Sequence, residues 1–143
     1  MRKDGWLAAV ILALAPSLLT TPGFALDESD RFLKEARRAA KRDNGSREGR
    51  HWELKNNSWL GPALTPTLTR CKREAPDGED KDFAMYLQLN ANGGVVQSAF
   101  EPRTAFSGCF RDGAAQLIYP NVPREGFWLE VKMHMHGKPP EQP

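Results

Sequence analysis

The residues best suited to chemistry lie near the end of the chain, in the run Met133-His-Met-His136. Alternate side chains of an extended strand share a face, so His134 and His136 would lie close enough together to bind one metal ion. Imidazole and thioether groups suit copper, and imidazole also suits zinc. Met133 and Met135, however, would point to the opposite face and fill the core. Because only two ligands converge, we expect no cofactor, and a copper- or zinc-binding protein is an alternative function.

Motifs of catalysis are missing from the sequence. It contains no Gly-x-Ser-x-Gly elbow, no His-Glu-x-x-His pair and no glycine-rich phosphate loop. The three histidines leave few candidates for a general base. The acids clustered between Asp77 and Asp82 stand in a glycine-containing segment, which is typical of a solvated loop. We therefore expect a protein that is not an enzyme.

The first 25 residues have the pattern of a secretory signal peptide. Two basic residues precede the apolar run Trp6–Leu14, and small residues precede a cleavage point after Ala25. The apolar run is too short for a stable membrane span of about 20 residues. We expect a cleaved signal (residues 1–25), no stable membrane span and a periplasmic protein. A retained anchor is the alternative.

The charge pattern is local rather than global. The net charge of +2 gives no reason to expect nucleic acid as a partner. Residues 26–50 are predicted to form a charged helix and linker, because acids open the segment and basic residues close it, as the helix dipole favours. Such a helix could lie on anionic lipid, but its apolar stripe is mostly alanine. A solvated helix docked on or tethered to the domain is the simpler interpretation.

The segment that follows is predicted to be irregular at first. Ser46–Asn57 has the composition of a linker, with a short edge strand at His51–Leu54. Thr65-Pro66 has the pattern of a helix start, and this helix continues past Cys71.

The two cysteines, Cys71 and Cys109, are predicted to form a disulfide. An exported chain meets an oxidising compartment, and an even cysteine count is consistent with one bond. A loop of this size corresponds to about 3–4 kcal/mol of stabilisation in the chain-entropy account. Redox or metal chemistry is the alternative, but the sequence has no Cys-x-x-Cys motif.

Three segments alternate between apolar and polar residues as half-buried strands do: Phe83–Asn90, Val95–Glu101 and Phe127–Met135. Asn92-Gly93 predicts a type I′ hairpin turn between the first two strands. This turn would place three pairs opposite each other: Leu89 and Val96, Leu87 and Ser98, Met85 and Phe100.

A helix is predicted from its N-cap Thr104 to Ile118, because apolar residues recur there every three or four positions. A helix laid across a small antiparallel sheet is an α+β fold, with about three strands and helices packed on one face. Residues 51–135 would form this disulfide-stapled domain, and residues 136–143 a disordered tail.

Four short sequence motifs in the second half of the chain follow one another in an order that matches a known family. They are Cys71 in a first helix, the hairpin Leu87–Val96, the helix start Phe106–Phe110, and Tyr119-Pro120 before the closing strand. Over about residues 66–135 this arrangement resembles the C-terminal domain family of TonB-type energy transducers, especially its disulfide-bearing periplasmic relatives. The resemblance implies a TonB C-terminal-like fold that binds protein without catalysis, with a partner peptide added as a strand to the sheet edge.

The function expected from the sequence is recognition of an envelope protein or peptide, through a sheet edge or an exposed strand face. Trp128, Glu130 and Lys132 share the wetter face of the last strand and are the candidate contacts, with Trp128 as an anchor. Trp128 could equally be covered by the N-terminal helix or by Trp52. An anchored TonB-like transducer component is a further alternative if the N-terminus is retained, although the chain lacks a long proline-rich spacer.

Overall fold

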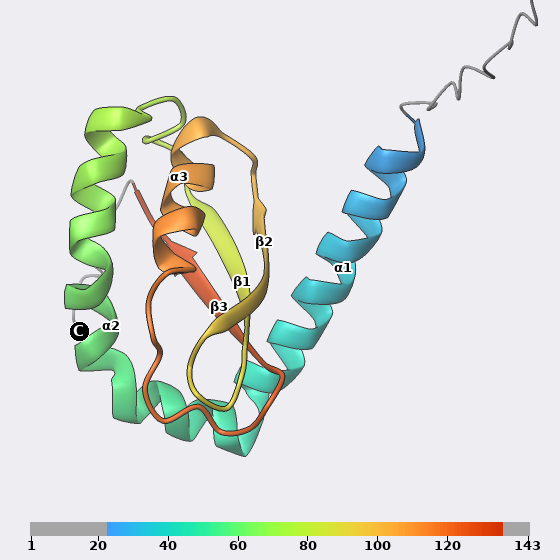
Figure 1. Cartoon of the computed structure of the whole chain (residues 1–143), viewed down its shortest axis with the longest axis vertical. Helices are drawn as coiled ribbons and strands as arrows, with labels where there is room; N and C mark the ends of the chain where they lie inside the picture. Colours follow the sequence, from blue (N-terminus) through green and yellow to red (C-terminus); the bar gives the residue numbers. More distant parts are fainter. Residues whose placement is uncertain (1–22, 136–143) are drawn as a thin grey trace, which may run out of the picture.

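The computed structural model describes residues 23–135, with side chains from Ser29 onward. These residues form, in chain order, α1 (Gly23–Gly45), α2 (Arg47–Glu74), β1 (Phe83–Leu89), β2 (Val95–Glu101), α3 (Ala105–Ala114) and β3 (Phe127–Met133). Figure 1 shows α2 and α3 beside the sheet, while the first turns of α1 extend away from it. The predicted α+β class is confirmed. Between residues 23 and 135, no helix has the length and apolar character that a membrane crossing needs.

The sheet is antiparallel, with β1 in the centre and β2 and β3 at the two edges. Met85 lies opposite Phe100 and Leu87 opposite Ser98, as the alternation predicts. Leu89 instead pairs with Val95, because the register shifts by one residue beside the turn.

The type I′ prediction for this turn is wrong, since Gly93 has a positive φ of +88° and Asn92 does not. Gly93 is needed for a close approach: an added Cβ would lie 2.1 Å from the carbonyl oxygen of Tyr119. The Tyr119 N–H donates to the Gly93 carbonyl at 2.9 Å. The segment after α3 therefore packs directly on the hairpin turn.

One face of the sheet carries the main core. Met85, Leu87 and Leu89 are fully buried there against α2 and α3. The predicted disulfide between Cys71 and Cys109 joins these two helices. It fixes the long α2 to the short α3.

The predicted start of α3 is confirmed, because Thr104 and Ser107 form a reciprocal capping box. The helix ends at Ala114, earlier than predicted. An added Cβ on Gly113 would lie 2.4 Å from the Thr67 side chain, so α2 approaches closely here. The buried Tyr119 hydroxyl then donates to the Ala114 carbonyl at 2.9 Å and closes the helix end.

The other face of the sheet is covered by α1. Ala36 and Ala40 are buried against a second cluster that contains Tyr86, Ala99 and Trp128. Helices packed on one face therefore describe α2 and α3, while α1 lies across the opposite face. The result is a three-layer arrangement with the sheet in the middle.

The linker predicted at Ser46–Asn57 is wrong, because this segment forms the first half of α2. Ser46 is its N-cap, accepting a hydrogen bond from the Gly49 N–H at 3.0 Å. The predicted edge strand at His51–Leu54 is likewise helical, and the predicted helix start at Thr65-Pro66 lies inside α2. Burial of Trp52, whose indole N–H donates to the Pro120 carbonyl at 2.8 Å, supplies the packing that continues the helix.

Candidate functional site

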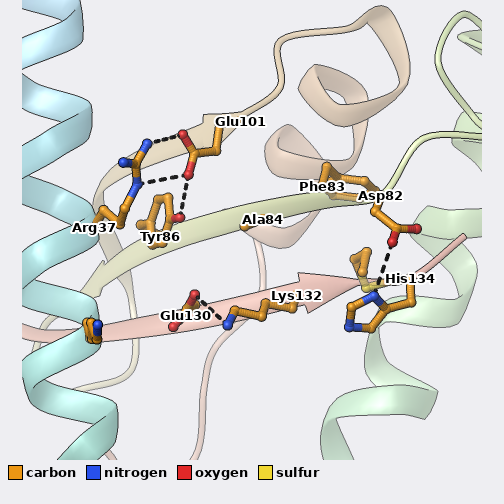
Figure 2. A pocket seen from close by; sticks show the side chains of 11 residues that line it. Arg37, Asp82, Phe83, Ala84, Tyr86, Glu101, Glu130, Lys132 and His134 are labelled. Atoms are coloured by element: carbon orange, nitrogen blue, oxygen red, sulfur yellow. Dashed lines mark hydrogen bonds and ion pairs between the residues drawn. The ribbon is translucent and has the colours of Figure 1, made fainter. Parts of the chain in front are cut away.

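A groove of about 510 Å³ lies between α1 and the sheet (Figure 2). Its lining combines charges of both signs with a few apolar side chains: Arg37, Lys41, Asp82, Phe83, Ala84, Tyr86, Glu101, Glu130, Lys132, Met133 and His134. The groove contains both charged residues of the candidate strand face and one of the two candidate histidines.

A three-residue clamp closes one end of this groove. The Arg37 guanidinium donates to both carboxylate oxygens of Glu101, with Nε 2.9 Å from Oε1. The Tyr86 hydroxyl donates to the same Oε1 at 2.7 Å. Because Arg37 belongs to α1, Glu101 to β2 and Tyr86 to β1, the clamp fastens the helix across the sheet.

The clamp shifts the acidity of its members. Burial raises the pKa of Tyr86 to about 12, and the hydrogen bond to Glu101 adds to this rise. Burial alone would raise the pKa of Glu101, but the hydrogen bonds from Arg37 and Tyr86 outweigh it and hold this pKa below its ordinary value. Glu101 is therefore ionised at neutral pH and Tyr86 stays protonated, an arrangement that holds two elements together.

Of the two candidate metal ligands, His134 and His136, the structure describes only the first. His134 is exposed, and its Nδ1 lies 3.2 Å from the Oδ2 of Asp82. The other Asp82 oxygen accepts the Met135 N–H at 2.7 Å, just after β3 ends. His136 lies outside the described residues. Within residues 29–135, no three side chains of His, Cys, Asp or Glu gather as they would around a metal ion.

The three candidate contacts on β3 also differ from one another. Trp128 is only 8% exposed, and its ring lies 6.3 Å from the ring of Phe32 on α1. Of the two covers considered for Trp128, the N-terminal helix is the one observed. Glu130 and Lys132 remain accessible and form an ion pair at 3.4 Å.

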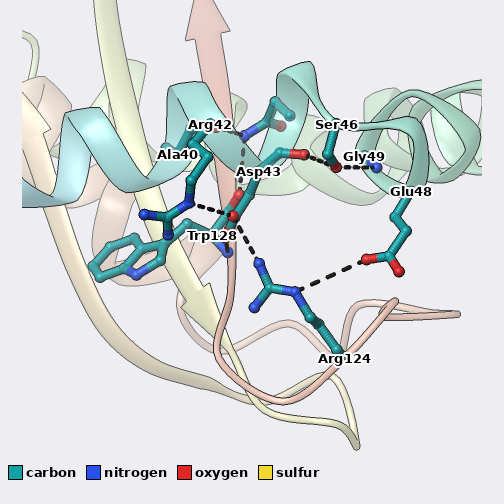
Figure 3. A network of polar contacts seen from close by, with 9 residues as sticks. Ala40, Arg42, Asp43, Ser46, Glu48, Gly49, Arg124 and Trp128 are labelled. Atoms are coloured by element: carbon teal, nitrogen blue, oxygen red, sulfur yellow. Dashed lines mark hydrogen bonds and ion pairs between the residues drawn. The ribbon is translucent and has the colours of Figure 1, made fainter.

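The outer edge of β3 is sealed at its start by the end of α1 (Figure 3). The Trp128 N–H donates to Oδ2 of Asp43 at 2.9 Å, and the Trp128 carbonyl accepts from Nδ2 of Asn44 at 2.9 Å. The Glu130 N–H donates to Oδ1 of Asn44 at 3.3 Å. Two side chains of one helix thus occupy three backbone groups that would otherwise be free to pair with another strand.

Asp43 is a buried carboxylate, with 2% of its side chain exposed. Its charge is balanced by Arg124 at 2.7 Å and by Arg42 at 3.3 Å. Beyond Glu130, the β3 edge borders a groove that leads to α2 and is lined in part by Leu60, Val131 and Lys132.

The outer edge of β2 is different. Since Trp128 points its N–H away from β1, the alternation of the antiparallel ladders makes Ser98 and Phe100 point theirs away from β1 on the other side. No hydrogen bond from residues 29–135 reaches these outward N–H and C=O groups. Val96 on the same strand is 54% exposed. The guanidinium of Arg111 lies 4.7 Å from the centre of the Phe100 ring and is paired with Asp112 at 2.7 Å, so this edge also carries charged side chains.

The residues that decide the character of the two edges are the ones that sequence reasoning missed. Asn44-Gly45 has the pattern of a helix end, and Asp43 has no local signal at all. Their partners on β3 lie more than eighty positions away. Only the three-dimensional arrangement brings these segments together.

Comparisons with known proteins add no relative to this picture, because no family model, no curated protein and no solved structure matches the chain.

Proposed function

We propose that this protein is a non-catalytic recognition domain that takes up an extended segment of a partner protein as an added strand on β2. The observation that carries the proposal is the row of outward backbone groups at Ser98 and Phe100, which no described residue occupies. A partner strand would gain main-chain hydrogen bonds there, and alternate side chains would provide specificity.

The surroundings of β2 support this proposal. Strand β2 is paired with β1 along its inner edge, and the ion pair of Arg37 with Glu101 holds its end. Its outer edge is therefore already in the extended conformation that a partner strand needs. Val96 offers an exposed apolar side chain, and Phe100 is only partly buried beside Arg111. The resemblance to TonB C-terminal domains supports the same binding mode, since strand addition is known in that family.

An exported, periplasmic location is the second part of the proposal. The disulfide between Cys71 and Cys109 suits an oxidising compartment, and the signal-like segment lies at residues 1–25, mostly outside the described residues. The expected partner is therefore an envelope protein or peptide.

Photocrosslinking in the native host tests the edge assignment. A photoreactive amino acid at Val96 is expected to give a defined adduct, whereas one at Leu54 of α2, which is 84% exposed, is not. In a second arm, Ser98→Pro removes an outward N–H and a long side-chain hydrogen bond from Arg111 but no bond to β1, so the Val96 adduct is expected to disappear while the fold persists. An adduct that forms at Lys132 instead, or that survives Ser98→Pro, would contradict the proposal.

The location has its own test, which is an intact mass of the native protein from fractionated cells. A soluble species that starts at Leu26 and gains two hydrogens on reduction is expected. A membrane-bound species that retains Met1 would overturn the location and favour an anchored transducer component.

A further inference from the structure

The excess positive charge of the domain is concentrated on one helix. The whole of α1 (Gly23–Gly45) contains six basic and five acidic residues, but from Arg31 to Arg42 it contains six basic residues and one acid, whereas residues 44–135 contain eleven of each. The acid near the end of the helix, Asp43, is buried and already balanced by Arg124 and Arg42. The outward side of α1 is therefore a basic surface on an otherwise neutral domain.

Five of these cations form one stripe along the helix. Their successive spacings of three, four, three and one place them on one side of an α-helix: Arg31, Lys34, Arg38, Lys41 and Arg42. All five are exposed, while Ala36 and Ala40 on the opposite side are buried against the sheet. The stripe runs for about 16 Å at a rise of about 1.5 Å per residue.

The fold itself gives these charges little compensation. Among residues 29–135, no hydrogen bond or ion pair engages Arg31, Lys34, Arg38 or Lys41. Like charges four residues apart, as Lys34 and Arg38 are, weaken a helix. Glu35 is the only acid between Arg31 and Arg42. Nothing inside the domain accounts for the row, so a counter-charge outside it is the natural partner.

The helix is also held so that this stripe stays turned to the solvent. Arg37 fastens its middle to Glu101, and Asp43 fastens its end to Trp128. Its apolar side is already committed to the sheet, where Phe32 packs on Trp128. The helix therefore has no free apolar face to insert into a lipid core, and binding through the stripe is electrostatic alone.

We infer that the outward face of α1 docks on a membrane surface rich in anionic phospholipid headgroups. A straight row of exposed cations on a fixed helix, four of them without an ion pair among the described residues, matches a plane of phosphates. The neutral remainder of the domain does not continue the basic surface around a nucleic-acid duplex. This surface lies on α1 and is distinct from the outer edge of β2, so separate substitutions can test the two.

Vesicle co-sedimentation of the purified full chain tests the inference. We expect binding to phosphatidylcholine vesicles that contain phosphatidylglycerol, no binding to phosphatidylcholine alone, and release at about 1 M salt, where charges are screened beyond about 3 Å. Because each basic residue near such a surface contributes about a fivefold gain in affinity, the variant with Arg31, Lys34, Arg38 and Lys41 all changed to Gln should bind about a hundredfold more weakly or worse.

The matched control changes four exposed cations of α2 and its neighbour segment to Gln, namely Lys55, Lys72, Arg73 and Lys81, and should bind like the native chain. Ser98→Pro should also bind vesicles normally, which separates this inference from the proposed function. Equal losses in both four-residue variants, binding that persists at high salt, or tighter binding to a DNA duplex than to the vesicles would overturn the inference.

Discussion

The two edges of the sheet are both flanked by α1, yet the helix treats them differently. At β3 it contributes Asp43 and Asn44 to the backbone groups of Trp128 and Glu130. At β2 its hydrogen bonds, among the described residues, come from Arg37 and reach a side chain, Glu101, so the backbone of Ser98 and Phe100 receives none. A covered face and a sealed edge are therefore separate properties, and one helix provides both on one side but only the first on the other.

This difference bears on function because an unsealed strand edge pairs readily with another chain. The start of β3 is protected by hydrogen bonds from α1, and the rest of that edge faces α2 across a narrow groove. The outward backbone groups of Ser98 and Phe100 in β2 form no hydrogen bond with any described residue. The edge that stays open is the one that the proposed function uses.

The largest expected effect concerns the disulfide that joins α2 to α3 on the face of the sheet opposite α1. Replacing Cys71 and Cys109 together by Ala should lower the free energy of unfolding by about 3–4 kcal/mol, because the unfolded chain loses its cross-link. Urea denaturation of the oxidised native chain and of the variant measures this difference. Reductant should destabilise the native chain and leave the variant unchanged; an equal response in both would show that the bond contributes nothing.

The next effect concerns the seal on β3. Asp43→Ala removes a buried carboxylate and leaves the Trp128 N–H and the Arg124 guanidinium without it, which should cost about 3 kcal/mol. Asp43→Asn keeps an acceptor for the N–H and should cost less. Thermal or urea unfolding measures both.

Asp112 provides a matched control, since it also pairs with an arginine but is exposed. Asp112→Ala should change stability by about 0.5 kcal/mol or less. If Asp43→Ala lowered the free energy of unfolding by as little as Asp112→Ala, the conclusion that Asp43 protects the β3 edge would be wrong.

How far the sequence determines this comparison depends on the range of each interaction. The alternation of Phe83–Asn90 predicts the strand and its register with Phe100, because these contacts lie within one hairpin. The seal by Asp43 spans more than eighty positions and has no periodic signal. The first half of α2 was missed for a related reason: Pro62 and Pro66 disfavour a helix locally, but the burial of Trp52 and Leu64 outweighs them. Which strand lies at which edge likewise follows only from the assembled sheet.

A smaller effect distinguishes inward from outward groups within β2 itself. Gln97 lies opposite Gln88, and its N–H points toward β1, so Gln97→Pro should break the ladder and cost about 2 kcal/mol. Ser98→Pro removes an outward N–H and should cost about 1 kcal/mol less than its neighbour. The urea midpoints of the two variants give the comparison. If Ser98→Pro were the less stable variant, the assignment of the outward N–H to Ser98 and of the inward N–H to Gln97 would be wrong.

The smallest effect tests the ion pair of Arg37 with Glu101, which joins α1 to β2 beside the apolar packing of Ala36 and Ala40 with Ala99. The pKa of Glu101 is held below its ordinary value of 4.5 in the folded chain, so near and below pH 4.5 the unfolded chain binds the proton more readily. The stabilisation is therefore complete above that range and is lost as the pH falls through the folded pKa. Its full size should be about 1 kcal/mol, typical of a partly exposed bidentate pair.

Glu101→Gln should remove this contribution at neutral pH and should flatten the acid limb of the stability curve by the same amount. Glu130→Gln is the matched control, because its ion pair with Lys132 lies on the surface of one strand and does not join α1 to the sheet. Amide hydrogen exchange then tests whether the attachments of α1 to the two edges are coupled. Amide exchange at Trp128 should stay slow in Glu101→Gln, since Asp43 still holds α1 on β3. If the Trp128 amide exchanged faster in Glu101→Gln, the hydrogen bonds of α1 to β3 would depend on its ion pair with β2. The two edges of the sheet would then be coupled through α1.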